Sequence, residues 1–203
     1  IAERAYQKAA AFARERIQSR AVDGSSGPVE IIRHPDVRRM LMTMRATTEA
    51  TRALGYVAAA ACDAMHASPD AGAVAQNKAF YEFLVPLVKG FSTEMSLEVA
   101  SLGVQVHGGM GFIEETGAAQ FYRDARILTI YEGTTAIQAN DLVGRKTARD
   151  GGRTARAIID AARATQAELA ASALPDCQWI GRRLGAGLDA LADVVDYMVV
   201  QAK

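Results

Sequence analysis

The 203-residue sequence predicts an all-α fold, a four-helix up-and-down bundle with additional helices toward its carboxyl end. Three observations predict this class. Long stretches carry apolar residues at helical spacing, no stretch shows convincing strand-like alternation, and Gly, Pro and Ser gather in short connections. Helices joined by short connections pack as antiparallel neighbours, and this arrangement gives a bundle.

The first two helices lie in the amino-terminal third. Residues 1–22 are Ala-rich with a helical apolar spacing, and a loop of Asp, Gly, Ser and Pro follows them at residues 23–28. Pro35 is a favourable first-turn residue, and it opens a second helix over residues 36–67. At 1.5 Å per residue this helix would be roughly 45 Å long, the length of a bundle element.

A Ser-Pro-Asp break separates the second helix from a third over residues 74–106, which we expect to bend at Pro86 or Gly90. Glycines then become frequent around a short helix at residues 118–128. Because glycine lets a backbone turn tightly or approach a ligand closely, this is the region in which to look for a binding site.

The last third continues the helical pattern. A fourth helix begins near Thr135, and two further helices are expected over residues 153–173 and 178–203. We therefore expect a bundle domain over residues 1–146 and a helical extension over residues 147–203. The final apolar face is unfinished and the sequence opens without Met, so we expect a part of a longer chain with a truncated extension.

Composition excludes several functional classes. The 23 Lys and Arg residues balance 23 Asp and Glu residues, so no net field attracts nucleic acid or an anionic membrane surface. The longest apolar stretch, residues 57–61, is far shorter than the roughly 20 residues that cross a bilayer. Cys62 and Cys177 are too isolated for a disulfide framework or a Cys-based zinc site, so a reducing, cytoplasmic location is expected.

Two segments interrupt the amphipathic pattern: Gln-Val-His-Gly-Gly-Met-Gly-Phe at residues 105–112 and Tyr-Glu-Gly-Thr-Thr-Ala-Ile-Gln at residues 131–138. Neither fits a Rossmann fingerprint or a P-loop. With Ala-Arg-Glu-Arg-Ile-Gln at residues 13–18 and Arg-Asp-Ala at residues 123–125, they follow one another in the order found in a known family. Over residues 1–146 the sequence resembles the carboxy-terminal helical domain of the flavin-dependent acyl-CoA dehydrogenases.

This resemblance implies an oxidoreductase that converts an acyl-CoA thioester into the trans-2-enoyl-CoA. Glu132 would be the base that removes the α-proton while the β-hydride passes to the flavin, and Tyr131 and Gly133 would lie beside the substrate. A carboxylate on a glycine-flanked turn suits this task, because glycine allows the backbone to approach cofactor and thioester closely.

The resemblance also implies an FAD site. Arg16 would contact the diphosphate with Gln18 beside it, and Thr134 would touch the cofactor after the base. A loop contacting the adenine side, contributed by a neighbouring subunit, would comprise Gln105, Val106, His107, Gly108 and Gly109. No metal site is expected, because His34 and His66 lie on other elements than His107, which we expect to be packed or capping.

The partners implied by the resemblance are an acyl-CoA substrate, an electron-transfer flavoprotein and further copies of the chain in a homodimer or homotetramer. The helical bundle and its extension would be inactive alone, because the flavin would lie between this bundle and a preceding β-domain. Two alternatives stay open: an acyl-CoA oxidase, and a homologue that has kept the helical bundle for a non-catalytic purpose.

Overall fold

A computed structural model describes residues 1–202 and divides them into two compact units. The first unit combines residues 1–60 with residues 87–136, and the second combines residues 61–86 with residue 137 onward. The fold is all-α, as predicted, apart from one short hairpin. Within the described range no helix is both long enough and apolar enough to cross a membrane.

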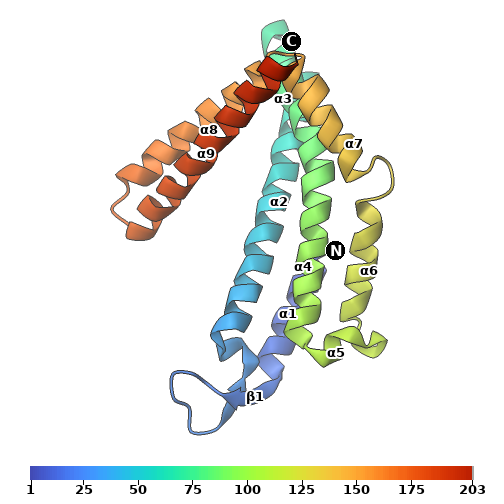
Figure 1. The fold of residues 1–203 in the computed structure, drawn as a ribbon, viewed down its shortest axis with the longest axis vertical. Helices are drawn as coiled ribbons and strands as arrows, with labels where there is room; N and C mark the ends of the chain where they lie inside the picture. Colours follow the sequence, from blue (N-terminus) through green and yellow to red (C-terminus); the bar gives the residue numbers. More distant parts are fainter. Residues whose placement is uncertain (203) are drawn as a thin grey trace. The chain divides into compact units, whose positions relative to one another are not determined.

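The first unit is built on four helices. In Figure 1, two of them run toward the hairpin marked β1 and two run away from it, and this alternation is the predicted up-and-down bundle. Those running toward the hairpin are α1 (Ala2–Glu15) and α4 (Ser92–His107). Those running away are the first part of α2 (Pro35–Ala67) and α6 (Ala118–Leu128).

Small side chains bring the helices of this unit close together. The buried face of α1 is formed by alanines, among them Ala5, Ala9 and Ala13, so α4 packs directly on its backbone. Met44 of α2 and Val99 of α4 fill the remaining space and are fully buried. The core is therefore dense next to the helix ends that carry the predicted site residues.

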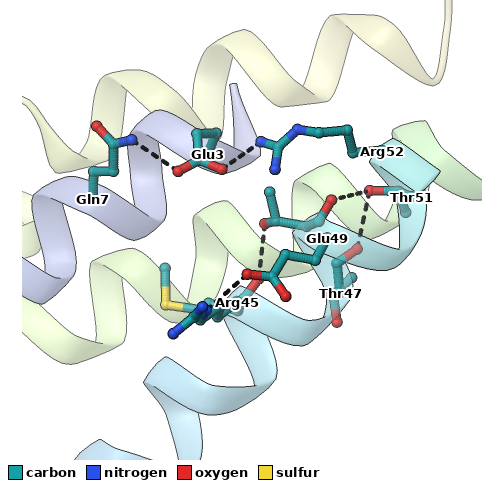
Figure 2. Close-up of polar contacts among 9 residues, drawn as sticks. Glu3, Gln7, Arg45, Thr47, Glu49, Thr51 and Arg52 are labelled. Carbon is teal, nitrogen blue, oxygen red and sulfur yellow. Dashed lines mark hydrogen bonds and ion pairs between the residues drawn. The ribbon is translucent and has the colours of Figure 1, made fainter. Parts of the chain in front are cut away.

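A polar network joins α1 to α2 on the surface of this core (Figure 2). Glu3 of α1 pairs with Arg52 of α2 and accepts a 2.8 Å hydrogen bond from the Gln7 amide. Arg45 and Glu49 form a further 2.8 Å pair along α2. The hydrogen bond from Arg52 holds the pKa of the Glu3 carboxyl below its ordinary value.

The first helix is shorter than predicted. It ends at Glu15, and the chain then forms an antiparallel hairpin of β1 (Ile17–Arg20) and β2 (Pro28–Glu30). Every residue of β1 is exposed, so the strand produces no apolar alternation in the sequence. The expectation that the first helix extends to residue 22 is therefore wrong, and Ile17 lies in β1 with its side chain 59% exposed.

The second helix is confirmed, and the third is interrupted at the place where only a bend is expected. After the short turn η1 (Ile31–Arg33), α2 begins at Pro35. The next α-helix, α3 (Ala71–Pro86), ends where Pro86 has no N–H to donate. A π-helical turn, η2 (Leu87–Phe91), follows before the chain continues as α4.

The second unit contains a helical hairpin of α8 (Arg153–Ala171) and α9 (Pro175–Gln201), as predicted; Lys203 lies outside the described residues. A Cβ on Gly185 would lie 2.4 Å from the Gln166 side chain, so glycine lets the two helices approach closely. Arg163 and Asp189 pair across them at 2.7 Å. The predicted fourth helix begins as α7 (Thr135–Asn140) and continues as the π-helical segment η4 (Asp141–Ala148).

Candidate functional site

A cavity of about 690 Å³ lies in the first unit, where α1 ends, the hairpin begins and α4 ends. We call it the hairpin pocket. Seven residues predicted to bind FAD are among its lining residues: Arg16, Gln18, Gln105, Val106, His107, Gly108 and Gly109. The remaining lining residues are Phe12, Ser19, Ile31, His34, Val37, Met40 and Met110. The structure thus gathers segments that are about 90 positions apart in the sequence.

The end of α1 places Arg16 at the pocket. Arg16 has extended backbone angles, φ −73° and ψ 116°, so it leaves the helix axis. The Ile31 N–H donates to its carbonyl at 2.8 Å. Gln18 follows two positions later, inside β1. The carbonyl oxygen of Gln18 lies 2.7 Å from His34 Nε2, and this contact holds the hairpin to the turn before α2.

Glycines shape the opposite wall of the pocket. Gly108 caps α4 at φ +60° and ψ −142°, a conformation available to glycine, and its N–H donates to the Gln105 carbonyl at 3.0 Å. A Cβ on Gly109 would meet nothing within 4 Å, so the backbone there is open to a ligand. Gly111 is different, because a Cβ would lie 2.3 Å from the Val104 carbonyl oxygen. Gly111 therefore serves packing rather than binding.

His107 forms the floor between these walls. Its side chain is buried, its ring stacks on Phe12 with the centroids 4.4 Å apart, and Nδ1 donates to the Gly103 carbonyl at 2.7 Å. Burial, together with the charge of Lys8, lowers the pKa of His107 below its ordinary value. A neutral ring with Nδ1 protonated leaves Nε2 as an acceptor. Residues 1–202 contain no cluster of three or more His, Cys, Asp or Glu able to hold a metal.

The chemistry of the pocket fits an anionic, hydrogen-bonding ligand such as FAD. Arg16 supplies a guanidinium, and Gln18 and Gln105 supply exposed amides. Gly108 and Gly109 leave their backbone groups accessible. The lining residues include no carboxylate that would repel a diphosphate. Arginine is the residue best suited to that group, since its planar fork donates two parallel hydrogen bonds.

Tyr131, Glu132, Gly133 and Thr134 are not among the residues that line this pocket. They belong to the connection between α6 and α7. We call this connection together with Thr135, the first residue of α7, the Glu132 loop (residues 129–135). Eleven-residue α6, about 16 Å long, lies between the glycine segment and this loop. The predicted site residues therefore form two groups within the first unit.

A backbone hydrogen bond joins the two ends of the Glu132 loop, and the backbone at its tip is strained. The Thr135 N–H donates to the Thr129 carbonyl at 3.3 Å, and Thr129 is buried. Glu132 is exposed and has φ +52°, followed by Gly133 at φ +96°. Among residues 1–202, the non-glycine residues with positive φ are Glu132 and Ser19 of the hairpin pocket. Such conformations gather at functional sites, where surrounding contacts enforce them.

The sequence model of the family described as "Acyl-CoA dehydrogenase, C-terminal domain" matches residues 1–147. The chain belongs to the acyl-CoA dehydrogenase family. It is 60% identical to the 3-methylmercaptopropionyl-CoA dehydrogenase of Ruegeria pomeroyi over 204 residues, which cover all of this chain and 34% of that protein. It is 38% identical to the broad-specificity linear acyl-CoA dehydrogenase FadE5 of Mycobacterium tuberculosis, over 72% of this chain and 25% of that protein.

Solved structures agree with this membership. The butyryl-CoA dehydrogenase of Megasphaera elsdenii superimposes with a TM-score of 0.52 at 27% identity, over 70% of this chain and 32% of that one. Caenorhabditis elegans ACDH-11, solved with C11-CoA, has a TM-score of 0.60 at 17% identity over 99% of this chain and 35% of that one, a likeness of fold alone. The chain spans about a quarter to a third of the length of these curated relatives.

In this member of the acyl-CoA dehydrogenase family, motif spacing identifies neither Ser19 in the hairpin pocket nor two side chains that contact the Glu132 loop or the residue just before it. The Lys89 ammonium donates to the Leu128 carbonyl, and the Glu94 carboxylate accepts from the Thr135 hydroxyl. These contacts join residues about 40 positions apart, and no local pattern signals them. The nearest signal in the sequence is Pro86, and it indicates only that the helix is disturbed close to the π-turn that carries Lys89.

Proposed function

We propose that these residues belong to an FAD-dependent acyl-CoA dehydrogenase that oxidises an acyl-CoA thioester to the trans-2-enoyl-CoA. One observation carries the proposal. In a chain of this family, an exposed carboxylate, Glu132, occupies the tip of a loop held in a left-handed conformation and followed by glycine. An acid of this kind suits the removal of a proton from a substrate that approaches the loop.

In the proposed reaction, Glu132 takes the α-proton and the C–H electron pair becomes the new C=C bond. FAD, when bound, accepts the hydride that leaves the β-carbon. Gly133 leaves room for the thioester beside the carboxylate, Tyr131 lies next to the acyl group, and Thr134 offers a hydroxyl to the cofactor. Base catalysis by a positioned carboxylate contributes about 10²- to 10⁴-fold in rate.

Arg16, Gln18 and the segment from Gln105 to Gly109 would hold the adenine and diphosphate part of FAD. His107 supports that segment from below, since its ring is fixed by Phe12 and by the Gly103 carbonyl. Because these residues and the Glu132 loop form separate groups, we propose that a homodimer or homotetramer brings the hairpin pocket of one subunit to the cofactor of another.

We propose a domain over residues 1–146 and a helical extension over residues 147–203. The match to the Ruegeria pomeroyi protein covers the whole chain and so includes this extension. The match to the butyryl-CoA dehydrogenase of Syntrophomonas wolfei covers only 70% of this chain.

A short thioether acyl-CoA, 3-methylmercaptopropionyl-CoA, is therefore the first substrate to test. Reoxidation by an electron-transfer flavoprotein and a cytoplasmic location complete the proposal; one relative is named as a subunit of a caffeyl-CoA reductase–Etf complex.

The test uses the complete protein and its visible flavin spectrum under anaerobic conditions. Addition of 3-methylmercaptopropionyl-CoA or butyryl-CoA should bleach the flavin, and Glu132→Gln should abolish bleaching while flavin stays bound. Glu115→Gln, at another exposed loop carboxylate, is the matched control and should bleach as the wild type does. A colourless protein, or a yellow one that no acyl-CoA bleaches, would favour a repurposed homologue. Rapid reoxidation by O₂ would favour an acyl-CoA oxidase.

A further inference from the structure

We propose that Lys89 and Glu94 are positioning residues that hold the carboxylate of Glu132 in its working orientation; this rests on the proposed role of Glu132 as the base. Lys89 lies in the π-turn η2, and Glu94 lies in the first turn of α4. Lys89 contacts Leu128 and Tyr131, which precede Glu132 in the sequence, and Glu94 contacts Thr135, which follows it. Neither side chain would touch substrate or cofactor in this role.

Lys89 holds the amino-terminal side of the loop. Its ammonium donates to the Leu128 carbonyl at 2.5 Å, at the end of α6, and lies 4.9 Å from the centroid of the Tyr131 ring. A hydrogen bond from a charged donor is stronger than a neutral one, and the face of a tyrosine ring attracts a cation. One side chain therefore fixes both the last turn of α6 and the residue that precedes Glu132.

Glu94 holds the carboxyl-terminal side. Its carboxylate accepts a 2.5 Å hydrogen bond from the Thr135 hydroxyl, while the Thr135 N–H closes the loop onto Thr129. Thr135 is also the first residue of α7. The residue three positions after Glu132 is thus fixed by a side-chain bond and a backbone bond at once.

The tip between these two anchors is strained. A left-handed conformation is disfavoured for a residue with a Cβ, yet Glu132 adopts φ +52°. Once an anchor is removed, the loop can relax toward a more favourable conformation, and the carboxylate then moves. Proton transfer requires close alignment, and a displacement of about 1 Å can lower a rate by about 10²-fold.

The experiment measures steady-state kinetics, flavin content and amide hydrogen exchange on the complete protein. Lys89→Met and Glu94→Met, which removes the acceptor for the Thr135 hydroxyl, should each lower kcat by about 10- to 100-fold while KM for the acyl-CoA and the bound flavin stay unchanged. Lys89→Arg keeps the charged donor and Glu94→Gln keeps an acceptor oxygen, so each should recover most of the loss. Amides of residues 129–135 should exchange faster in Lys89→Met and Glu94→Met than in the wild type.

Two control variants carry the same chemical changes away from the loop. Lys78→Met, on an exposed face of α3, and Glu98→Met, one turn further along α4 from Glu94, should leave kcat and loop exchange unchanged. In a Glu132→Gln background, Lys89→Met should cause no further loss of the residual rate, because a positioning residue acts only through the base.

The outcomes separate this inference from the proposed function. If Glu132→Gln keeps full activity, the proposed function fails. If Glu132→Gln is inactive but Lys89→Met and Glu94→Met turn over at the wild-type rate, the positioning role fails alone. An equal further loss in the Glu132→Gln background would also overturn it. Should Lys89→Met lose flavin or fail to fold, Glu94→Met, which has a similar side-chain length but no acceptor oxygen, decides the matter.

Discussion

The hairpin pocket and the Glu132 loop each contain one non-glycine residue in a left-handed conformation, Ser19 and Glu132, but they are built differently. The pocket rests on the ends of two helices, on buried His107 and on a strand pair. The loop is exposed at its tip and depends on polar anchors from η2 and α4. A binding surface can thus be fixed by packing, whereas an exposed proton acceptor is held by a few directional bonds.

The same replacement at the two strained positions gives the largest contrast. Glycine accepts positive φ, so Glu132→Gly and Ser19→Gly should each raise the free energy of unfolding by about 1 kcal/mol. Glu132→Gly should at the same time lower flavin reduction by about 10²- to 10⁴-fold, because the base is gone. Ser19→Gly should leave the rate within about twofold, since the neighbouring Arg16 and Gln18 stay in place. Thermal unfolding and anaerobic flavin bleaching of the complete protein measure both effects.

Two experimental results would contradict this comparison. Bleaching that is lost in Ser19→Gly but retained in Glu132→Gly would reverse the roles assigned to the two regions. A lowered unfolding temperature in both variants would mean that the left-handed conformations are not strained, and the argument from strain at Glu132 would then fail with them.

The next effect concerns binding at the hairpin pocket. Arg16→Met should weaken FAD affinity by about 10- to 100-fold, because a charge-assisted hydrogen bond to a diphosphate contributes about 1.5–3 kcal/mol. Arg14→Met, on an exposed residue of α1 two positions earlier, is the matched control and should retain FAD. Equilibrium dialysis followed by absorbance of the retained flavin measures the affinity. Unchanged FAD retention in Arg16→Met would remove the diphosphate contact from the pocket.

Sequence reasoning predicted the elements whose signals are local. Pro35 marks the start of α2, and the glycine-rich segment after His107 becomes the wall of the pocket. The hairpin at residues 17–30 escaped prediction because β1 is exposed along its whole length and leaves no alternating pattern. Local patterns show which residues carry chemistry, whereas contacts between distant segments become visible only in the fold.

The Glu132 loop illustrates the same division. The sequence indicates its motif and the turn-forming Gly133, and the resemblance to a family gives Glu132 its expected role. The left-handed φ of Glu132 itself cannot be predicted from the sequence, because glutamate seldom adopts it. The anchors Lys89 and Glu94 cannot be predicted either, since their partners are about 40 residues away.

The smallest expected effect is a pH dependence at the floor of the hairpin pocket. Burial lowers the pKa of His107 in the folded state, so folding favours the neutral ring. The stability that it contributes is present above the unfolded pKa of about 6.5 and is lost as the pH falls from there toward the lowered folded value. His107→Asn keeps an N–H for the Gly103 carbonyl but cannot titrate in this range.

At pH 7.5, His107→Asn should be less stable than the wild type by about 1 kcal/mol, because the ring stacked on Phe12 is lost. This difference should shrink as the pH falls below about 6.5, since the wild type loses stability there and the variant does not. Thermal unfolding between pH 5 and 8 measures both proteins. Parallel curves for the wild type and His107→Asn would show that burial does not hold His107 neutral, and the rigid, neutral floor of the pocket would have to be abandoned.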